Sequence, residues 1–281
     1  MQHINFVHPV LRTPLVRKDN TLVCEQNGDT FTIQNGVPIF VPQDLEAHME
    51  EERSGLVNTV KTLLRTFPWL YVALIYIISP VCHTGLSAQR FLKRFSEKST
   101  LLNIGSGVHT FTANVLNVDI FYYKGVDIVA DATRLPLADN SIDGIICESL
   151  LEHVPDPNAI MADMLRVLKP GGQMYIVVPF VYPFHACPND FYRWSQTGVQ
   201  EMCKGATIEK IGVRSGPSGA LMGQLTTWVA IVLSFGWTPL YNLLSMLLLV
   251  IFFPIKFLDY LFARYPTAIH GAGQFYAVVT K

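Results

Sequence analysis

Apolar runs alternate with helix-forming segments along the central part of the chain. Five runs have the length and β-branched content of buried strands, and they cover residues 99–107, 115–120, 125–133, 141–149 and 173–180. Asp156-Pro157 marks the start of a helix between the last two of these runs, and Pro170-Gly171-Gly172 marks its end. A capping box at Thr197–Gln200 predicts another helix, and further strands are expected over 207–213 and 274–281. The alternation predicts an α/β fold in which helices cover a parallel sheet.

Residues 1–44 have a different pattern, typical of a small β unit. Two short runs, LVCEQ and TFTIQ, flank a turn at Asn27-Gly28-Asp29, and a second turn at Asn35-Gly36 precedes VPIFVP. Such turn sequences supply the positive φ values that tight hairpins need.

These runs, with LRTPL before them, resemble the zinc-ribbon-like domain of the tRNA-methyltransferase activator family. That family has two C-x-x-C knuckles, which align here with His8 and Leu11 and with Cys24 and Asn27. A tetrahedral zinc site needs four N or S ligands, and Leu11 supplies none. We therefore expect hairpin packing instead of a metal, and assign no residue of the chain to a metal. The unit is expected to dock a protein partner or to be a plain β-hairpin cap.

Residues 45–98 have a helical pattern. Apolar residues recur at helical spacing between Leu56 and Phe67, with Lys61 and Arg65 on the other side. The uncharged segment 66–89 follows, but prolines and a glycine leave it an apolar run shorter than the roughly 20 residues of a spanning helix. We expect a linker that lies in the membrane interface, or a helix that packs on the protein's own core.

The strongest membrane signal is the stretch from 215 to 255, where 41 positions contain no charged residue and no histidine. Gly236 and Pro239 divide it into two apolar pieces, each somewhat shorter than the roughly 20 residues of a comfortable span. Because the strands on either side belong to one sheet, both ends of the stretch are expected on one side of a membrane. The pattern predicts a hairpin of two short helices or an anchor embedded in the membrane surface.

Composition agrees with contact to lipid and limits the class of protein. The chain is 50% hydrophobic and 15% charged, whereas soluble domains carry about 25% charged residues. The apolar content excludes a disordered chain, and the net charge of −1 offers no basic surface to nucleic acid. Five cysteines are scattered without a close C-x-x-C pair, and no apolar run follows a basic start at the N-terminus. We therefore expect reduced thiols, no secretory signal and a catalytic domain in the cytosol.

A glycine turn and two acidic residues follow the first three strands in order. Gly105-Ser106-Gly107 ends the first strand, Asp119 ends the second, and Asp131 follows the third. Bare backbone at a strand's carboxyl end, next to an acid on the neighbouring strand, is typical of doubly wound sheets that bind nucleotide-like ligands. The segments LPLADNSIDGIICESLLEHVPDP and RVLKPGG complete the series.

This series resembles the class I S-adenosylmethionine-dependent methyltransferases, in the type 11 subgroup with D-x-x-x-L-P-F-x-D-x-S-F-D and L-K-P-G-G signatures. The resemblance implies a doubly wound, mostly parallel, seven-stranded Rossmann-like sheet and S-adenosylmethionine as the cofactor. The residues that it assigns to the cofactor are Asn103, Gly105, Ser106, Gly107, Asp119, Asp131, Ala132 and Glu148.

Each of these positions has an implied role. The glycine turn would line the methionine moiety, and Asp119 would accept hydrogen bonds from the ribose hydroxyls. Asp131 and the Ala132 backbone would meet the adenine edge, and Glu148 would lie near the methyl group. Asn103 stands where the family usually has Asp, so it brings no charge opposite the ammonium group. The short gap between Asp119 and Asp131 predicts a loop in place of the usual helix.

Two segments offer a proton acceptor for an alcohol substrate. Glu152-His153 follows the fourth strand, and the loop HACPNDFYRWS follows the fifth, on the same rim as the glycine turn. The loop resembles the H-x-x-P-x-D-F-x-R-[YW] segment of methyltransferases from bacterial glycan and envelope clusters. We expect His185 to act as the base and Asp190 to orient it, with His153 as the second candidate. Alternatively, His153 packs against a helix, and Asp190 pairs only with Arg193.

The pattern predicts four parts: a small β unit over 1–44, a helical linker over 45–98, a methyltransferase domain over 99–214 and 271–281, and a membrane-anchoring insertion over 215–270. We expect a membrane-associated methyltransferase on the cytoplasmic face, whose acceptor is a lipid-linked glycan, a phospholipid or a quinone-like molecule, methylated on oxygen. The alternative is a non-catalytic scaffold with the same fold. A dehydrogenase is disfavoured because G-x-G-x-x-G is absent, and RNA methylation is disfavoured by the neutral charge and the apolar insertion.

Overall fold

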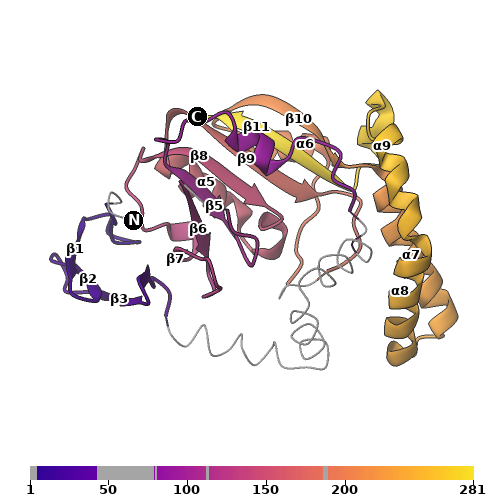
Figure 1. Cartoon of the computed structure of the whole chain (residues 1–281), viewed down its shortest axis with the longest axis horizontal. Helices are drawn as coiled ribbons and strands as arrows, with labels where there is room; N and C mark the ends of the chain where they lie inside the picture. The colour runs from indigo at the N-terminus through magenta and orange to yellow at the C-terminus, as the bar shows by residue number, and fades with distance from the viewer. Residues whose placement is uncertain (1–4, 43–78, 80, 112–113, 186–188) are drawn as a thin grey trace.

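The computed structural model describes residues 5–42, 79, 81–111, 114–185 and 189–281, and its largest part is a seven-stranded sheet (Figure 1). The strand order is β10-β11-β9-β8-β5-β6-β7. The strands are β5 (Leu101–Ile104), β6 (Val115–Asp119), β7 (Ile128–Val129), β8 (Ile142–Glu148), β9 (Leu168–Pro179), β10 (Thr207–Ser215) and β11 (Gln274–Thr280). The five neighbouring strands β9, β8, β5, β6 and β7 pair in parallel, whereas β11 is antiparallel to β9 and β10. The predicted doubly wound, mostly parallel sheet is therefore confirmed.

The chain reverses direction across the sheet at β5. It runs from β5 outward to β6 and β7, and then returns to β8 and β9 on the other side. All four residues of β5 are buried, as expected of a central strand covered on both faces. A reversal of this kind opens a crevice at the carboxyl ends of the strands, where doubly wound sheets bind their ligands.

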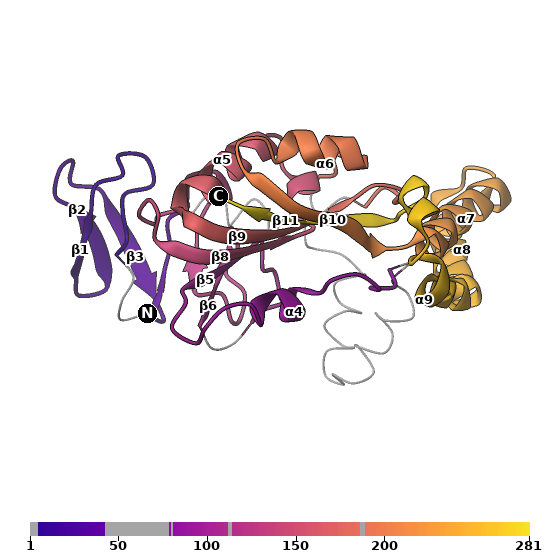
Figure 2. The same ribbon diagram turned by 90° about the horizontal axis from the view of Figure 1, so that it is seen from above.

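Helices cover both faces of the sheet (Figure 2). On one face lie α5 (Pro157–Val167) and α6 (Gln196–Met202), whose apolar residues join the main core. On the other lies α4 (Ala88–Leu92), which packs against Tyr175 and Tyr276. The short helices η1 (Ala132–Arg134) and η2 (Leu151–His153) follow β7 and β8. As predicted, residues 120–127 between β6 and β7 form a loop and not a helix.

Of the two helix starts predicted from the sequence, one was confirmed and the other was wrong. Asp156 caps α5 as predicted, because its side chain accepts a hydrogen bond from Ala159 N and Pro157 occupies the first turn. The capping box placed at Thr197 was wrong. Ser195, two residues earlier, is the cap and accepts a hydrogen bond from Gly198 N at 3.2 Å.

The N-terminal β unit is a separate antiparallel sheet of β1 (Leu15–Lys18), β2 (Thr21–Cys24), β3 (Thr30–Gln34) and β4 (Val37–Pro38). At its first knuckle, buried His8 accepts hydrogen bonds on Nδ1 from Val10 N and Leu11 N. Its Nε2 lies 2.8 Å from Asp29 Oδ2. These bonds tie the knuckle to the β2–β3 turn through side-chain contacts, while the resemblance to zinc ribbons stays a prediction.

The N-terminal unit is joined to the edge of the large sheet. Phe40 N donates to Val129 O on β7, and Ile39 forms a parallel bridge with Val129. Arg12 reaches further, with Nη2 at 2.8 Å from Asp163 Oδ1 on α5. Asp163 is nearly buried and also accepts hydrogen bonds from Arg166 and from Leu135 N. This carboxylate therefore links segments that are distant in the sequence.

A helical hairpin is inserted before the last strand. It consists of α7 (Pro217–Ser234) and α8 (Thr238–Phe252), joined by a turn in which Phe235 and Gly236 have positive φ. Further short helices, η3 (Phe253–Leu258), α9 (Asp259–Phe262) and η4 (Pro266–His270), lead back to β11. Asp259 accepts hydrogen bonds from Ser218 N and Gly219 N and so caps α7 from the returning segment. The predicted helical insertion is confirmed.

Both ends of the hairpin lie at the carboxyl rim of the parallel strands. Ser215 at the end of β10 pairs with Gln274 at the start of β11, and Gln274 also pairs with Pro179 at the end of β9. Within the described residues, the helical segment Thr238–Phe262 is long and apolar enough to cross a membrane by length and composition. The exact boundaries of the four predicted parts stay predictions. Most of the predicted helical linker over 45–98 lies outside the described residues, and among the described ones only Ala88–Leu92, helix α4, is helical.

Asp163→Asn tests the link between α5 and the N-terminal segment. We expect it to lower the free energy of unfolding by about 3 kcal/mol, because two arginines then lose the charge that they pair with in a buried place. Asp139→Asn is the matched control, since Asp139 is exposed and its ion pair within the described part of the chain is with Arg166; its effect should stay below about 1 kcal/mol. Urea unfolding of both variants measures the difference, and equal losses would contradict this account.

Candidate functional site

The glycine turn after β5 has a backbone that only glycine adopts readily. Gly105 and Gly107 have φ of +69° and +52°. A Cβ on Gly105 would lie 2.9–3.0 Å from side-chain atoms of Leu150, so there is no space for one. Between the glycines, Ser106 is buried, and its hydroxyl has no hydrogen-bond partner among the described residues. The turn therefore presents main chain, and not side chains, to the crevice.

Asp119, at the end of β6, is joined directly to this turn. Its Oδ2 accepts a hydrogen bond from Gly107 N at 2.7 Å, and its Oδ1 accepts one from Phe121 N at 2.9 Å. A parallel pairing of β5 with β6 puts the two strand ends side by side. The glycine turn and the acid predicted from the sequence thus lie at one point of the sheet.

A pocket opens beside this junction. Its walls are mainly apolar, with carboxylates at Asp119 and Asp131, and its lining residues are Ile104, Gly105, Val118, Asp119, Ile120, Ala130, Asp131, Ala132, Leu150, Val154 and Ile160. Asp131 is exposed and caps η1 by accepting a hydrogen bond from Thr133 N. An apolar pocket with two carboxylates among its lining residues suits an aromatic base attached to a sugar.

The structure brings some of the predicted cofactor residues together and leaves others apart. Gly105, Asp119, Asp131 and Ala132 line the pocket, and Ser106 and Gly107 belong to the turn beside it. Asn103 is not part of the lining. Its amide donates to His109 O and to Asn117 Oδ1, both at 3.1 Å, so it braces the loop between β5 and β6.

Glu148 also lies outside the lining of the pocket, at the end of β8. Burial raises its pKa, while Arg214, with Nε at 3.8 Å from Glu148 Oε1, acts in the opposite direction. Sequence reasoning missed seven apolar residues that form the walls of the pocket: Ile104, Val118, Ile120, Ala130, Leu150, Val154 and Ile160. Their positions next to Gly105, Asp119 and Asp131, around Glu152-His153 and in α5 were the available signal.

The loop after β9 is held by an ion pair. Arg193 binds both carboxylate oxygens of Asp190, at 2.5 and 2.6 Å, and these hydrogen bonds lower the pKa of Asp190 to about 2. Asp190 also accepts a hydrogen bond from His185 N at 2.8 Å. The His185 ring is less closely held by Asp190, with Nδ1 at 3.4 Å from Oδ2 and at 3.1 Å from Pro183 O. The pairing with Arg193 is thus present, and the roles of His185 and Asp190 in catalysis stay predictions.

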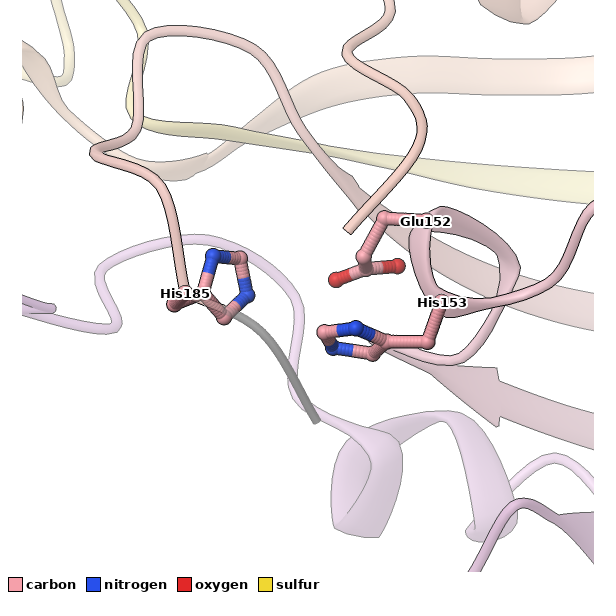
Figure 3. A group of neighbouring side chains, drawn as sticks. All are labelled: Glu152, His153 and His185. Carbon is pink, nitrogen blue, oxygen red and sulfur yellow. The ribbon is translucent and has the colours of Figure 1, made fainter. Parts of the chain in front are cut away.

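His153 and His185 come from different segments and meet at the rim (Figure 3). Their ring centroids are 5.0 Å apart with an interplanar angle of 80°. His153 Nδ1 lies 2.6 Å from Asn189 O, so the ring is tied to the loop after β9 and not only packed against a helix. Burial lowers the pKa of His185, which favours the neutral imidazole that a base requires.

Glu152 lies beside both imidazoles and is fully buried. Neither of its carboxylate oxygens makes a hydrogen bond of full geometry among the described residues, and only its own backbone N–H and the Ser149 hydroxyl lie near enough to favour its charged form. Burial raises the pKa of Glu152 from 4.5 to about 7. This carboxyl group therefore binds its proton more tightly in the folded chain than in the unfolded chain. Its contribution to stability is fully present below the unfolded pKa and is lost as the pH rises through the folded pKa.

Glu152→Gln should therefore flatten the dependence of stability on pH between about 4.5 and 7 in a buffer that contains a metal chelator. The parent chain should lose up to about 3 kcal/mol of unfolding free energy across this range from Glu152 alone, and the neutral isostere should not. Urea unfolding at several pH values measures the difference between the two proteins. Parallel curves would show that Glu152 does not titrate as its burial requires.

Comparison with known proteins gives a family for the central part of the chain. Residues 81–176 match the family of the methyltransferase domain. A demethylmenaquinone methyltransferase of Renibacterium salmoninarum is 40% identical over 74 residues, which are 26% of this chain and 31% of that protein. A ubiquinone biosynthesis O-methyltransferase of Xanthomonas oryzae is 42% identical over 61 residues, or 22% and 23% of the two chains. The chain thus spans about a third or less of the length of these curated relatives.

Among solved structures, an S-adenosylmethionine-dependent methyltransferase from Methanosarcina mazei covers 70% of this chain and 98% of its own, with 13% identity and a TM-score of 0.43. The family match, the strand order and the antiparallel last strand agree with one another. Residues 81–176 therefore match the methyltransferase domain family, and the sheet has the class I, Rossmann-like methyltransferase fold.

Proposed function

We propose that the protein is an S-adenosylmethionine-dependent methyltransferase that methylates a lipophilic, quinone-like acceptor at a membrane. The observation that carries this proposal is the junction of the glycine turn with Asp119 beside an apolar pocket, within a chain segment that matches the methyltransferase family. The acceptor class is supported by the relatives, one of which is named as a demethylmenaquinone methyltransferase and the other as an O-methyltransferase of ubiquinone biosynthesis.

The residues at the pocket suit the parts of the cofactor. The bare turn at Gly105 leaves room for the methionine portion to approach the main chain, where a side chain would collide with Leu150. Asp119 would accept hydrogen bonds from the ribose hydroxyls, as an acid at the end of the second strand does in dinucleotide folds. The adenine ring would lie between the apolar walls, with Asp131 and the Ala132 backbone at its edge.

The bound cofactor supplies an electrophilic methyl group on a positively charged sulfur with a good leaving group. The protein's task is then to align the acceptor oxygen with the carbon–sulfur bond, and alignment alone can contribute about 7–11 kcal/mol. The oxygen–carbon bond forms as the carbon–sulfur bond breaks, and the hydroxyl proton passes to a base. His185 is the proposed base, since its Nδ1 faces Pro183 O and leaves Nε2 to take the proton. His153 is the second candidate.

The helical hairpin supports action at a membrane. Only Leu248 is buried among the residues of α8, and the large side chains Trp228, Phe235 and Trp237 are exposed, Phe235 by 91%. An exposed apolar surface of this kind marks a contact with lipid or with another protein. Since the hairpin leaves and rejoins the sheet at the carboxyl rim, lipid contact would bring that rim to the membrane surface, on its cytoplasmic side where the cofactor is made.

Asp119→Asn tests the cofactor site. We expect the affinity for S-adenosylmethionine to fall about 10- to 100-fold, because a hydrogen bond to a charged group contributes about 1.5–3 kcal/mol. Asp139→Asn, which removes an exposed carboxylate at another place, should bind as the parent does. Titration calorimetry on the detergent-purified chain measures both. Unchanged binding by Asp119→Asn would contradict the assigned pocket, and a parent chain that binds no cofactor would favour the scaffold alternative.

Paired substitution of the hairpin, Phe235→Glu with Leu247→Glu, tests the membrane contact. Two exposed apolar side chains become charged, and such groups disfavour insertion into lipid. We expect flotation with phospholipid vesicles to fall by at least half. Val10→Glu is the matched control, because Val10 is equally an exposed apolar residue but belongs to the N-terminal unit. If the parent protein does not float with the vesicles, the proposed membrane location is wrong.

A further inference from the structure

Three potential metal ligands converge beside the cofactor pocket. Glu152 and His153 belong to η2 after β8, and His185 belongs to the loop after β9. One ligand atom from each lies within 4.8 Å of those of the other two. In Figure 3 the carboxylate and the two rings point toward one another. The fold therefore brings together, from two segments, side chains that together could hold an ion.

Main-chain carbonyls orient both imidazoles. A carbonyl only accepts hydrogen bonds, so the contact of His153 Nδ1 with Asn189 O at 2.6 Å puts the ring proton on Nδ1. His185 Nδ1 lies near two acceptors, Pro183 O at 3.1 Å and Asp190 Oδ2 at 3.4 Å. One donor, Arg193 Nη2, also lies 3.4 Å from this nitrogen. The two acceptors favour the same tautomer. Each histidine then carries its lone pair on Nε2, and its Nδ1–H is held as in metal-binding histidines.

The carboxylate of Glu152 gives an independent reason to expect an ion. Its side chain is completely buried, and neither oxygen makes a hydrogen bond of full geometry among the described residues. Buried polar groups in folded proteins are almost always paired, because leaving them unpaired is costly. A cation between Glu152 and the two histidines would be bound by one carboxylate oxygen. Its positive charge would also stabilise the other oxygen.

We propose that Glu152, His153 and His185 bind a divalent transition-metal ion such as Zn²⁺. Two imidazoles and one carboxylate are a common ligand set for such ions and leave a coordination position open. Bonds of about 2.0–2.2 Å place tetrahedral ligands roughly 3.4 Å apart, so the three side chains must close by about 1 Å around the ion. His185 is half-buried and lies on a loop, whereas Glu152 is fully buried in η2, so His185 is the side chain that we expect to move.

The position of the site suggests what the ion does, and this step rests on the proposed function. Leu150 and Val154, on either side of Glu152-His153, line the cofactor pocket. The ion site therefore adjoins this pocket, and in the proposal the acceptor oxygen occupies the open coordination position and faces the methyl group. An acceptor hydroxyl bound there would lose its proton to water more readily, since a Lewis acid stabilises the oxyanion. With the ion bound, His185 Nε2 is a ligand, and water takes the proton in its place. That oxygen then forms its bond to the methyl carbon as the carbon–sulfur bond breaks.

Metal titration of the full-length, detergent-purified chain tests the site. After dialysis against a chelator, Zn²⁺ is titrated by calorimetry, and Co²⁺ is added as a spectroscopic probe of the coordination geometry. We expect one ion per chain. Glu152→Gln and His185→Asn should each weaken binding by at least about tenfold. His270→Asn, a surface histidine in η4, is the matched control and should bind as the parent does.

Two further measurements distinguish failure of the metal site from misfolding and from failure of the proposed function. Thermal unfolding and cofactor binding of each variant, with chelator present, show whether it is folded. If folded Glu152→Gln and His185→Asn bind Zn²⁺ as tightly as the parent, the metal site is overturned. If the parent binds no Zn²⁺ yet methylates its acceptor in chelator, the metal proposal fails, the proposed function stands, and the histidines act as proton acceptors. If Zn²⁺ binds as expected but no cofactor does, the proposed function fails and the metal site remains.

Discussion

The hydrogen bond between Asp119 and Gly107 N is the contact on which the site depends. It joins the carboxyl ends of β5 and β6 at the point where the chain reverses across the sheet. Because Gly105 adopts a positive φ and has no space for a Cβ, the turn can present its main chain there. An acid, bare backbone and an apolar pocket therefore share one small region, and neither strand could supply it alone.

The carboxyl rim also organises the rest of the molecule. The loop after β9, the short helix η2 and both ends of the apolar hairpin all start or end there. In the proposed function, this arrangement would connect three tasks in one place: holding a methyl donor, handling the acceptor's proton or oxygen, and contacting the phase in which a lipophilic acceptor is dissolved.

Local patterns in the sequence were enough to predict the strands, the helix cap at Asp156, the loop after Asp119 and the helical insertion. These features depend on residues close together in the chain or on the known order of parallel strands. Contacts between distant segments could not be predicted in this way. Arg12 binds Asp163 across 151 positions, and Asn103 turns to Asn117 and His109 instead of the pocket. Ser195 and Thr197 both belong to the residue types that cap helices, and the backbone path selects Ser195.

The most direct measurement of the central claim is transfer of label from methyl-labelled S-adenosylmethionine to lipid. The full-length protein in detergent is incubated with the labelled donor and a total lipid extract, and the organic phase is then separated by chromatography. The account predicts label in a lipophilic fraction that migrates with methylated quinones. Label that stays entirely in the aqueous phase, from a protein that is folded and supplied with the extract, would contradict it.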